Sequence, residues 1–220
     1  MRLSMTILYD FLQQSYSDVW ADEPEGSLHL KGAVCYRSDV IQQNKDFICI
    51  GRIKDMKEEI EKRNDFYGIC IVENLSEYAC LKNKKNHNII YLSSAGTFQG
   101  IFNKVQGLFF HYQDWEERLC QALVNHADIE SLCRLSSGIF DNMIHVYDRN
   151  LFLLGSANEK DGETIWEDDK DTGRKVLSIE TINNFKYEKN FKETMSTQGV
   201  QMYEDDFSPE RVMYINIWEE

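Results

Sequence analysis

Short apolar runs and one charged segment alternate along the first part of the chain. Four runs rich in β-branched and aromatic residues cover His29–Tyr36, Phe47–Ile53, Tyr67–Glu73 and Asn88–Leu92. Continuous apolar runs of this length are typical of strands buried on both faces of a parallel sheet. The charged segment Lys54–Lys62 keeps its apolar residues on one side and carries an i, i+4 ion pair, so we expect a crossover helix there.

The order strand, helix, strand predicts a small α/β domain with a parallel sheet over residues 1–95. A short amphipathic helix is expected at Met5–Phe11, where apolar residues recur at helical spacing. The polar and acidic residues 15–27 are interpreted as a loop.

The strongest periodicity of the sequence lies between Thr97 and about Asn125, where apolar residues recur in steps of three and four. A helix of that length would span roughly 40 Å. We therefore assign residues 96–127 to a long helix, either a core helix of one domain or a connecting helix that pairs in a homodimer. Under the second interpretation, the interface residues are Phe98, Phe102, Val105, Phe109 and Tyr112.

Residues 128–220 are predicted to form a partial antiparallel-sheet domain of the PAS-like or GAF-like kind. Asp128 can cap a helix that ends near Ser137, and the turn Asp148-Arg149-Asn150 joins two apolar strands into a hairpin. A charged loop at 156–175, a mixed and possibly helical segment at 176–191 and two further strands at 200–203 and 212–218 follow. The chain stops after a strand, so we expect the sheet to be incomplete. The fold class is thus α/β, or α+β when both parts are counted.

Three segments carry a resemblance to a known family. Phe102–Leu119 resembles the linker helix of PucR-type (CdaR-like) transcription regulators of Gram-positive bacteria. Ile139–Asn150 looks like the start of their sensor domain, and Tyr214–Trp218 is similar to a strand that precedes further sheet. The resemblance covers about residues 97–155; over 1–96 only the α/β order fits, and 156–210 match little.

The resemblance implies a ligand-sensing region that relays a small-molecule signal through the long helix. Members of the family contact DNA through a C-terminal helix-turn-helix, which this sequence lacks. We therefore expect no direct nucleic-acid binding by this chain, with DNA reached through a missing C-terminal domain. The family motif is structural, so it implies no catalytic residue.

The charge distribution agrees with that expectation. Residues 128–220 hold 20 acidic and 10 basic side chains, whereas residues 1–127 hold 17 and 14, and the whole chain has a formal charge of −13. An acidic surface repels phosphate backbones and anionic membranes. Six cysteines without a C-x-x-C pair, several of them in apolar runs, are interpreted as buried thiols of a reducing cytosol. With no signal peptide or spanning segment evident, we expect a cytoplasmic protein.

The sequence carries no recognisable catalytic or metal-binding motif. The chain contains no glycine-rich phosphate loop, no G-x-S-x-G and no H-E-x-x-H, so neither an enzyme nor a metal or other cofactor is expected. The cluster Asp168, Asp169, Asp171 and Gly173 fails the calcium-loop template because its glycine comes one position early. A solvated acidic loop is the favoured interpretation of that cluster.

A small-ligand pocket in the sensor domain is the remaining hypothesis. Its expected lining residues are His145, Tyr147, Phe152, Trp166 and Phe185, although plain core packing is the favoured explanation of Tyr147 and Phe152. Acidic neighbours would suit a cationic or amide-bearing effector. The alternative from another functional class is a stand-alone interaction or dimerisation module without a ligand, and an unrecognised enzyme in the α/β domain is the third.

Overall fold

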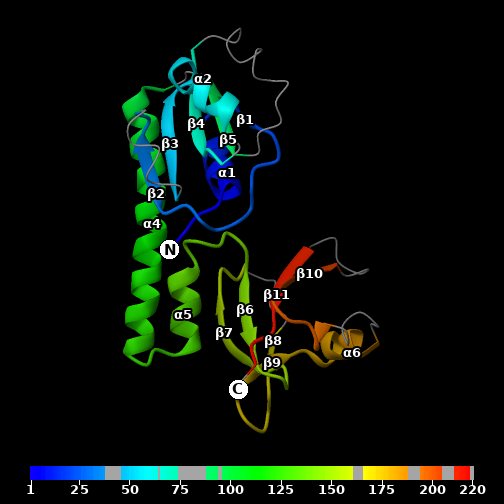
Figure 1. The fold of residues 1–220 in the computed structure, drawn as a ribbon. Helices are drawn as coiled ribbons and strands as arrows, with labels where there is room; N and C mark the ends of the chain where they lie inside the picture. Colours follow the sequence, from blue (N-terminus) through cyan, green and yellow to red (C-terminus); the bar gives the residue numbers. More distant parts are fainter. Residues whose placement is uncertain are drawn as a thin grey trace. The chain divides into compact units, whose positions relative to one another are not determined.

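The computed structural model describes residues 1–37, 46–63, 65–73, 88–93, 96–160, 166–187, 194–204 and 211–218, with the backbone alone at 184–187, 203, 204 and 211 (Figure 1). The chain divides into two compact units, residues 1–121 and 122–220, and each is described by itself.

A five-stranded, mostly parallel sheet forms the centre of the first unit. Its strand order is β1-β5-β4-β3-β2, and β2, β3, β4 and β5 run parallel to one another. The strands are β1 (Val19–Ala21), β2 (Gly32–Cys35), β3 (Phe47–Arg52), β4 (Gly68–Val72) and β5 (Ile89–Ser93). The predicted α/β order of the N-terminal part is confirmed.

The edge strand β1 was missed by the sequence analysis, which placed residues 15–27 in a loop. Three residues are too few to show an alternating pattern, so only the structure reveals that Val19–Ala21 pairs antiparallel with β5. Trp20 of β1 stacks on Tyr91 of β5, with ring centroids 6.2 Å apart. The sheet is therefore mixed at this edge.

Helices cover both faces of this sheet. α2 (Ile53–Lys62) packs Ile53, Met56 and Ile60 on one face, as its charged but amphipathic sequence predicted. α1 (Met5–Ser15) and α4 (Phe98–Val124) share the core on the other face, where Leu8 and Leu12 lie with Val105 and Phe109. The result is three layers: helix, sheet and helices.

The apolar stripe of α4 packs into this core, as the interpretation as a core helix predicts, and a homodimer through this helix stays a prediction. Val105 and Phe109 are 0% and 1% exposed, so these two side chains present no surface to a second chain. Phe98, Phe102 and Tyr112 are partly buried against the same core. The helix extends from Phe98 to Val124, as predicted, but belongs to the first unit as far as Gln121.

The second unit combines short helices with antiparallel strands. Its elements are α5 (Ile129–Ser136), β6 (Ile144–Tyr147), β7 (Leu153–Ala157), β8 (Trp166–Asp168), β9 (Lys175–Leu177), α6 (Ile179–Tyr187), β10 (Val200–Glu204) and β11 (Arg211–Ile215). The Asp128 cap and the β6–β7 hairpin are as predicted. β8 was not predicted, since its residues were assigned to a charged loop. Two of its three residues, Glu167 and Asp168, are acidic, so the sequence shows no strand pattern there.

The antiparallel strands form three two-stranded ladders, β6–β7, β8–β9 and β10–β11. A single bridge between Phe152 and Val176 links the first two ladders. The described residues thus give antiparallel pairs rather than one continuous sheet, and the PAS-like or GAF-like assignment stays a prediction.

The thiols divide between core and surface. Cys49, Cys70 and Cys133 are buried, as expected, and burial raises the pKa of Cys49 to about 11. Cys35 and Cys120 are exposed, contrary to the interpretation of the cysteines as buried residues. Apolar neighbours in sequence place a thiol in a strand or helix but do not decide which way it faces.

α5 and β7 meet at Gly155, which allows a close approach of their backbones. A Cβ at Gly155 would lie 2.8 Å from the backbone nitrogen of Glu130 and 2.9 Å from its Cα. Glu130 in turn accepts a hydrogen bond from the backbone N–H of Ser156 at 2.9 Å. Only a glycine fits where these backbones touch.

Replacing Phe109 by alanine is expected to lower the free energy of unfolding by roughly 3–5 kcal/mol, because a fully buried aromatic ring leaves a cavity. The matched control is Phe110→Ala one position along the same helix, where the ring is 59% exposed. That variant should change stability by less than about 0.5 kcal/mol. Urea unfolding measures both, and equal losses would contradict the placement of the stripe.

Replacing Gly155 by alanine is expected to destabilise the second unit by roughly 1–3 kcal/mol, because backbone atoms of α5 must move to admit the methyl group. Gly138→Ala provides the control, since a Cβ there meets no atom within 4 Å. Thermal unfolding followed by circular dichroism compares the two. A Gly155→Ala protein as stable as the control would show that α5 does not pack on β7 in this way.

Candidate functional site

Three of the five predicted pocket residues meet in the second unit. His145 and Tyr147 lie two positions apart on β6, which places their side chains on one side of the strand, and Trp166 comes from β8. The His145 and Trp166 rings meet edge to face with centroids 5.3 Å apart, and the Tyr147 and Trp166 centroids are 6.5 Å apart. We call His145, Tyr147 and Trp166 the aromatic cluster.

A carboxylate stands beside this cluster. Glu159 Oε1 lies 3.7 Å from His145 Nε2, too far for a direct hydrogen bond. His145 Nε2 is itself buried and has no hydrogen-bond partner among the residues that the structure describes. Buried polar atoms are nearly always paired in folded proteins, so this nitrogen marks a place where a polar partner fits.

The position of Glu159 is fixed by the residue before it. Asn158 adopts a left-handed backbone conformation with φ of 59°. Its side-chain amide donates hydrogen bonds to the backbone carbonyls of Ser137, Phe140 and Asn142. These bonds tie the end of β7 to the segment between α5 and β6, so Glu159 leaves β7 in a set direction.

Burial lowers the pKa of His145, and the nearby Glu159 carboxylate offsets only part of that effect. The imidazole therefore stays neutral to a lower pH than an exposed histidine, while Glu159 offers a partly exposed carboxylate. A neutral imidazole and a carboxylate 3.7 Å apart can both accept hydrogen bonds from one N–H-bearing group placed about 2.9 Å from each.

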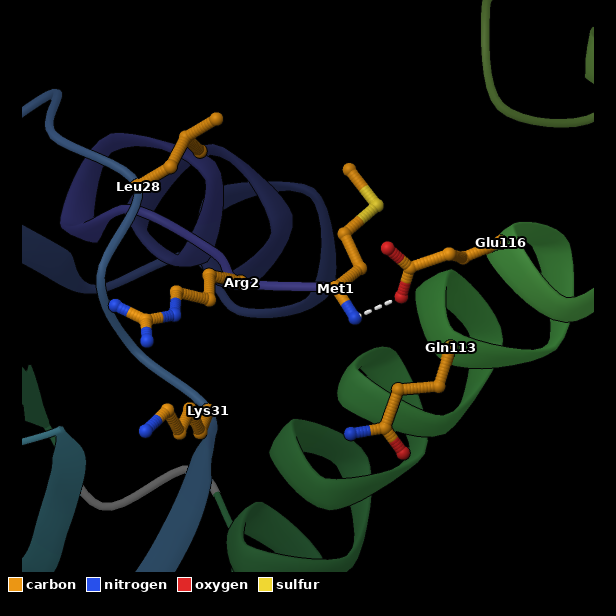
Figure 2. A pocket seen from close by; sticks show the side chains of 6 residues that line it. All are labelled: Met1, Arg2, Leu28, Lys31, Gln113 and Glu116. Carbon is orange, nitrogen blue, oxygen red and sulfur yellow. Dashed lines mark hydrogen bonds and ion pairs between the residues drawn. The ribbon is translucent and has the colours of Figure 1, made fainter. Parts of the chain in front are cut away.

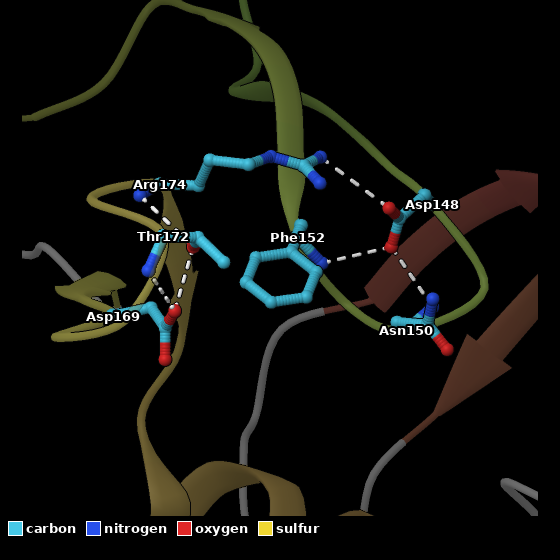
Figure 3. Close-up of polar contacts among 6 residues, drawn as sticks. All are labelled: Asp148, Asn150, Phe152, Asp169, Thr172 and Arg174. Atoms are coloured by element: carbon cyan, nitrogen blue, oxygen red, sulfur yellow. Dashed lines mark hydrogen bonds and ion pairs between the residues drawn. The ribbon is translucent and has the colours of Figure 1, made fainter.

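Phe152, the fourth predicted residue, packs elsewhere. The Arg174 guanidinium lies over its ring, 4.5 Å from the centroid, and so covers one face. Figure 3 shows this stack beside Asp148, whose carboxylate reaches Arg174 Nη2 at 3.3 Å and accepts hydrogen bonds from the backbone N–H groups of Asn150 and Phe152. Burial acts to raise the pKa of Asp148, but these donors together hold it below its usual range. Phe152 therefore belongs to the hairpin turn.

The fifth predicted residue is not placed by its side chain. Phe185 lies on α6, but its side chain is outside the described residues. Glu159 was missed by the sequence analysis. One signal could have found it: Glu159 comes two residues after β7, and the predicted hairpin pairs β7 with the strand that bears His145.

The acidic segment between β8 and β9 forms a hairpin turn. Asp169 accepts hydrogen bonds from the N–H and hydroxyl of Thr172 at 2.8 and 2.6 Å (Figure 3). Gly173 follows with φ of 67°. Within the described ranges, no group of three or more potential metal-binding side chains comes together.

An open pocket of about 520 Å³ lies in the first unit. Figure 2 shows its lining, which comprises Met1, Arg2, Leu28, Lys31, Gln113 and Glu116. The Met1 ammonium pairs with Glu116, and Lys31 Nζ lies 2.5 Å from Asp46 Oδ2. The Met1 ammonium and Lys31 at this opening are thus each paired with a carboxylate.

No family model, curated protein or solved structure matches this chain. None of the helices in the described part of the chain has the length and apolar character needed to cross a membrane.

The depressed pKa of His145 predicts how stability depends on pH. Unfolding exposes the imidazole and restores its ordinary pKa of about 6.5, so the unfolded chain binds a proton more readily than the folded one. The stabilisation is present above pH 6.5 and is lost as pH falls through the folded pKa. Melting temperatures from pH 7.5 to 5 should fall less steeply for His145→Gln than for the parent chain. Parallel curves would contradict the burial of His145.

Proposed function

We propose that this chain is the ligand-sensing region of a cytoplasmic bacterial transcription regulator. The resemblance of its long helix and following hairpin to PucR-type regulators supports the proposal, together with the site in the second unit. DNA contact belongs to a domain outside this chain. The thiols of Cys49 and Cys70, which are buried and unpaired, agree with a reducing compartment. No catalytic step is proposed.

One observation carries the sensing function: a buried imidazole nitrogen without a hydrogen-bond partner lies 3.7 Å from a carboxylate, beside two aromatic rings. An effector group that donates to both would satisfy the nitrogen and pair with the charge. The chemistry points to a primary ammonium or an amide N–H, because Glu159 attracts cations and the faces of Trp166 and Tyr147 favour them as well.

The surrounding charge supports the same class of effector. Residues 128–220 carry twice as many acidic as basic side chains, so the field of this part of the chain draws cations and disfavours anionic metabolites. Arg174, a cation of this unit, is occupied by Asp148 and by the ring of Phe152. It does not compete for the carboxylate of Glu159.

The long helix supplies a physical route for the signal. α4 is held by the core of the first unit through Val105 and Phe109 and continues past Gln121 into the second unit. We propose that effector binding in the second unit changes the stability or orientation of the last turns of α4. Such a two-state helix is a known element of regulatory switches.

The test is a nuclear magnetic resonance titration of the histidine Cε1–H signals with methylammonium. Tetramethylammonium is the matched probe, since it carries the same charge but no N–H. We expect methylammonium to shift the His145 signal with a Kd on the order of 10 mM, as the ligand has only two heavy atoms, whereas tetramethylammonium leaves the signal nearly unchanged.

Two variants assign the effect to this site. Glu159→Gln removes the charge and should weaken methylammonium binding at least about threefold, while Glu167→Gln removes an exposed carboxylate from β8 and should leave it unchanged. Equal responses to both probes, or equal weakening by both variants, would overturn the proposed effector site and leave only the field of the acidic chain.

A stand-alone interaction module is the second candidate function. The specific observation in its favour is a group of exposed apolar side chains on β10 and β11.

A further inference from the structure

Two basic side chains lie side by side on one wall of the pocket in the first unit. An antiparallel bridge joins Leu3 to Leu30 through backbone hydrogen bonds of 2.8 and 3.0 Å. This register sets Arg2 opposite Lys31, and both residues line the pocket (Figure 2). The bridging leucines are both buried, so Arg2 and Lys31 next to them face outward. Like charges directly opposite one another are unfavourable unless an anion neutralises them.

The two basic side chains differ in their partners. Lys31 Nζ lies 2.5 Å from Asp46 Oδ2, whereas the Arg2 guanidinium has neither an ion pair nor a hydrogen bond with any residue that the structure describes. The hydrogen bond from Lys31 lowers the pKa of Asp46 against the effect of burial, and the charges of Arg2 and His29 lower it further. Basic groups therefore set the electrostatic potential at this wall, and the Arg2 guanidinium is available to a bound anion.

The opposite wall of the pocket comes from α4. Figure 2 shows Gln113 and Glu116 on this helix, across the opening from the two basic side chains. Glu116 pairs with the Met1 ammonium, but the Gln113 amide has no hydrogen bond within the described ranges. Leu28 adds an apolar side chain that is 56% exposed. The pocket therefore combines a guanidinium and an amide that are open to a ligand with an apolar surface.

These groups together fit a carboxylate that carries a short apolar chain. The planar guanidinium of Arg2 offers parallel N–H groups in a geometry that matches the two oxygens of a carboxylate. The Gln113 amide can donate a further hydrogen bond, and Leu28 offers contact to hydrocarbon. The pocket volume of about 520 Å³ lies within the range of small-molecule sites, roughly 300–1,000 Å³.

Two carboxylates near the opening limit the charge of the ligand. Glu116 lines the pocket and Asp46 is bonded to Lys31, so both act on a ligand held at Arg2. Each of these carboxylates is already paired with a cation, which leaves Arg2 as one unmatched positive charge. A monoanion suits that charge, whereas a dianion such as phosphate would also meet repulsion from Glu116 and Asp46.

We infer that this pocket is a binding site for a small monocarboxylate with a short apolar chain. The carboxylate pairs with Arg2 and accepts a hydrogen bond from Gln113, and the chain lies on Leu28. Such a ligand contacts the N-terminal segment and α4 at once and so fastens them to each other. The site lies entirely in the first unit, so the inference does not depend on the proposed effector site near His145.

The experiment is a nuclear magnetic resonance titration of the full chain that follows the Arg2 Nε–H and Gln113 side-chain amide signals. Isocaproate is the probe, and we expect it to shift both signals with a Kd on the order of 1 mM, in keeping with its small size. Isocaproamide has the same shape without the charge, and acetate has the charge without the chain. Both should bind at least about fivefold more weakly.

Three variants assign the binding to its parts. Arg2→Gln removes the guanidinium and should weaken isocaproate binding about tenfold or more. Arg118→Gln is the matched control, because Arg118 is 57% exposed on α4 and does not line the pocket, and it should leave the affinity unchanged. Leu28→Ser should remove most of the preference for isocaproate over acetate and leave acetate binding as it was. All three side chains are exposed, and circular dichroism melts confirm that the variants remain folded.

Three outcomes would overturn the inference. Equal binding of isocaproate and isocaproamide would show that the pocket recognises no charge. Full affinity in Arg2→Gln, or equal weakening by Arg118→Gln, would place the binding elsewhere or reduce it to bulk charge. Tighter binding of inorganic phosphate than of isocaproate would make phosphate the ligand class. None of these results bears on the methylammonium response, which is read at His145.

Discussion

The burial of one stripe of α4 against the parallel sheet is the constraint on which the first unit depends. Ile101, Val105 and Phe109 are at most 1% exposed, and together with α1 they complete the layer over one face of the sheet. A parallel sheet has both faces apolar and needs this cover. The stripe is therefore buried by residues of the same chain, which fixes this part of the helix. The last turn of the helix continues past Gln121.

The second unit is held differently. Its buried apolar side chains among the described residues are Cys133, Ala157, Trp166 and Leu177, so Trp166 is by far the largest. Because apolar burial is small, specific contacts hold its elements together. They are the close approach of α5 to Gly155, the three hydrogen bonds of the Asn158 amide and the hydrogen-bonded turn at Asp148. A unit with a small core opens locally at low cost. Under the proposed function, a ligand that contacts Trp166 and His145 would add to this small core and stabilise the unit.

Much of the architecture was predictable because periodicity reports burial directly. The buried parallel strands, α2 and α4 follow from runs and stripes that no other structure explains. Short elements escaped: β1 has three residues, and in β8 two acidic residues follow Trp166. The sequence also left open whether the apolar stripe of α4 packs in a core or in a dimer interface, since both require the same spacing of apolar residues. In the candidate site, His145 and Tyr147 were predicted on a strand and Trp166 in a charged loop, whereas Glu159 depends on a left-handed turn at Asn158 that sequence alone does not reveal.

Amide hydrogen exchange of the full chain, with and without saturating methylammonium, tests the central claim most directly. The account predicts the slowest exchange at Ile101–Phe109 of α4, faster exchange in β6 and β8, and selective slowing of β6 and β8 when methylammonium is added. Uniform protection of the whole chain, or exchange in β6 and β8 that methylammonium leaves unchanged, would contradict a firm first unit joined to a loosely packed, ligand-responsive second unit.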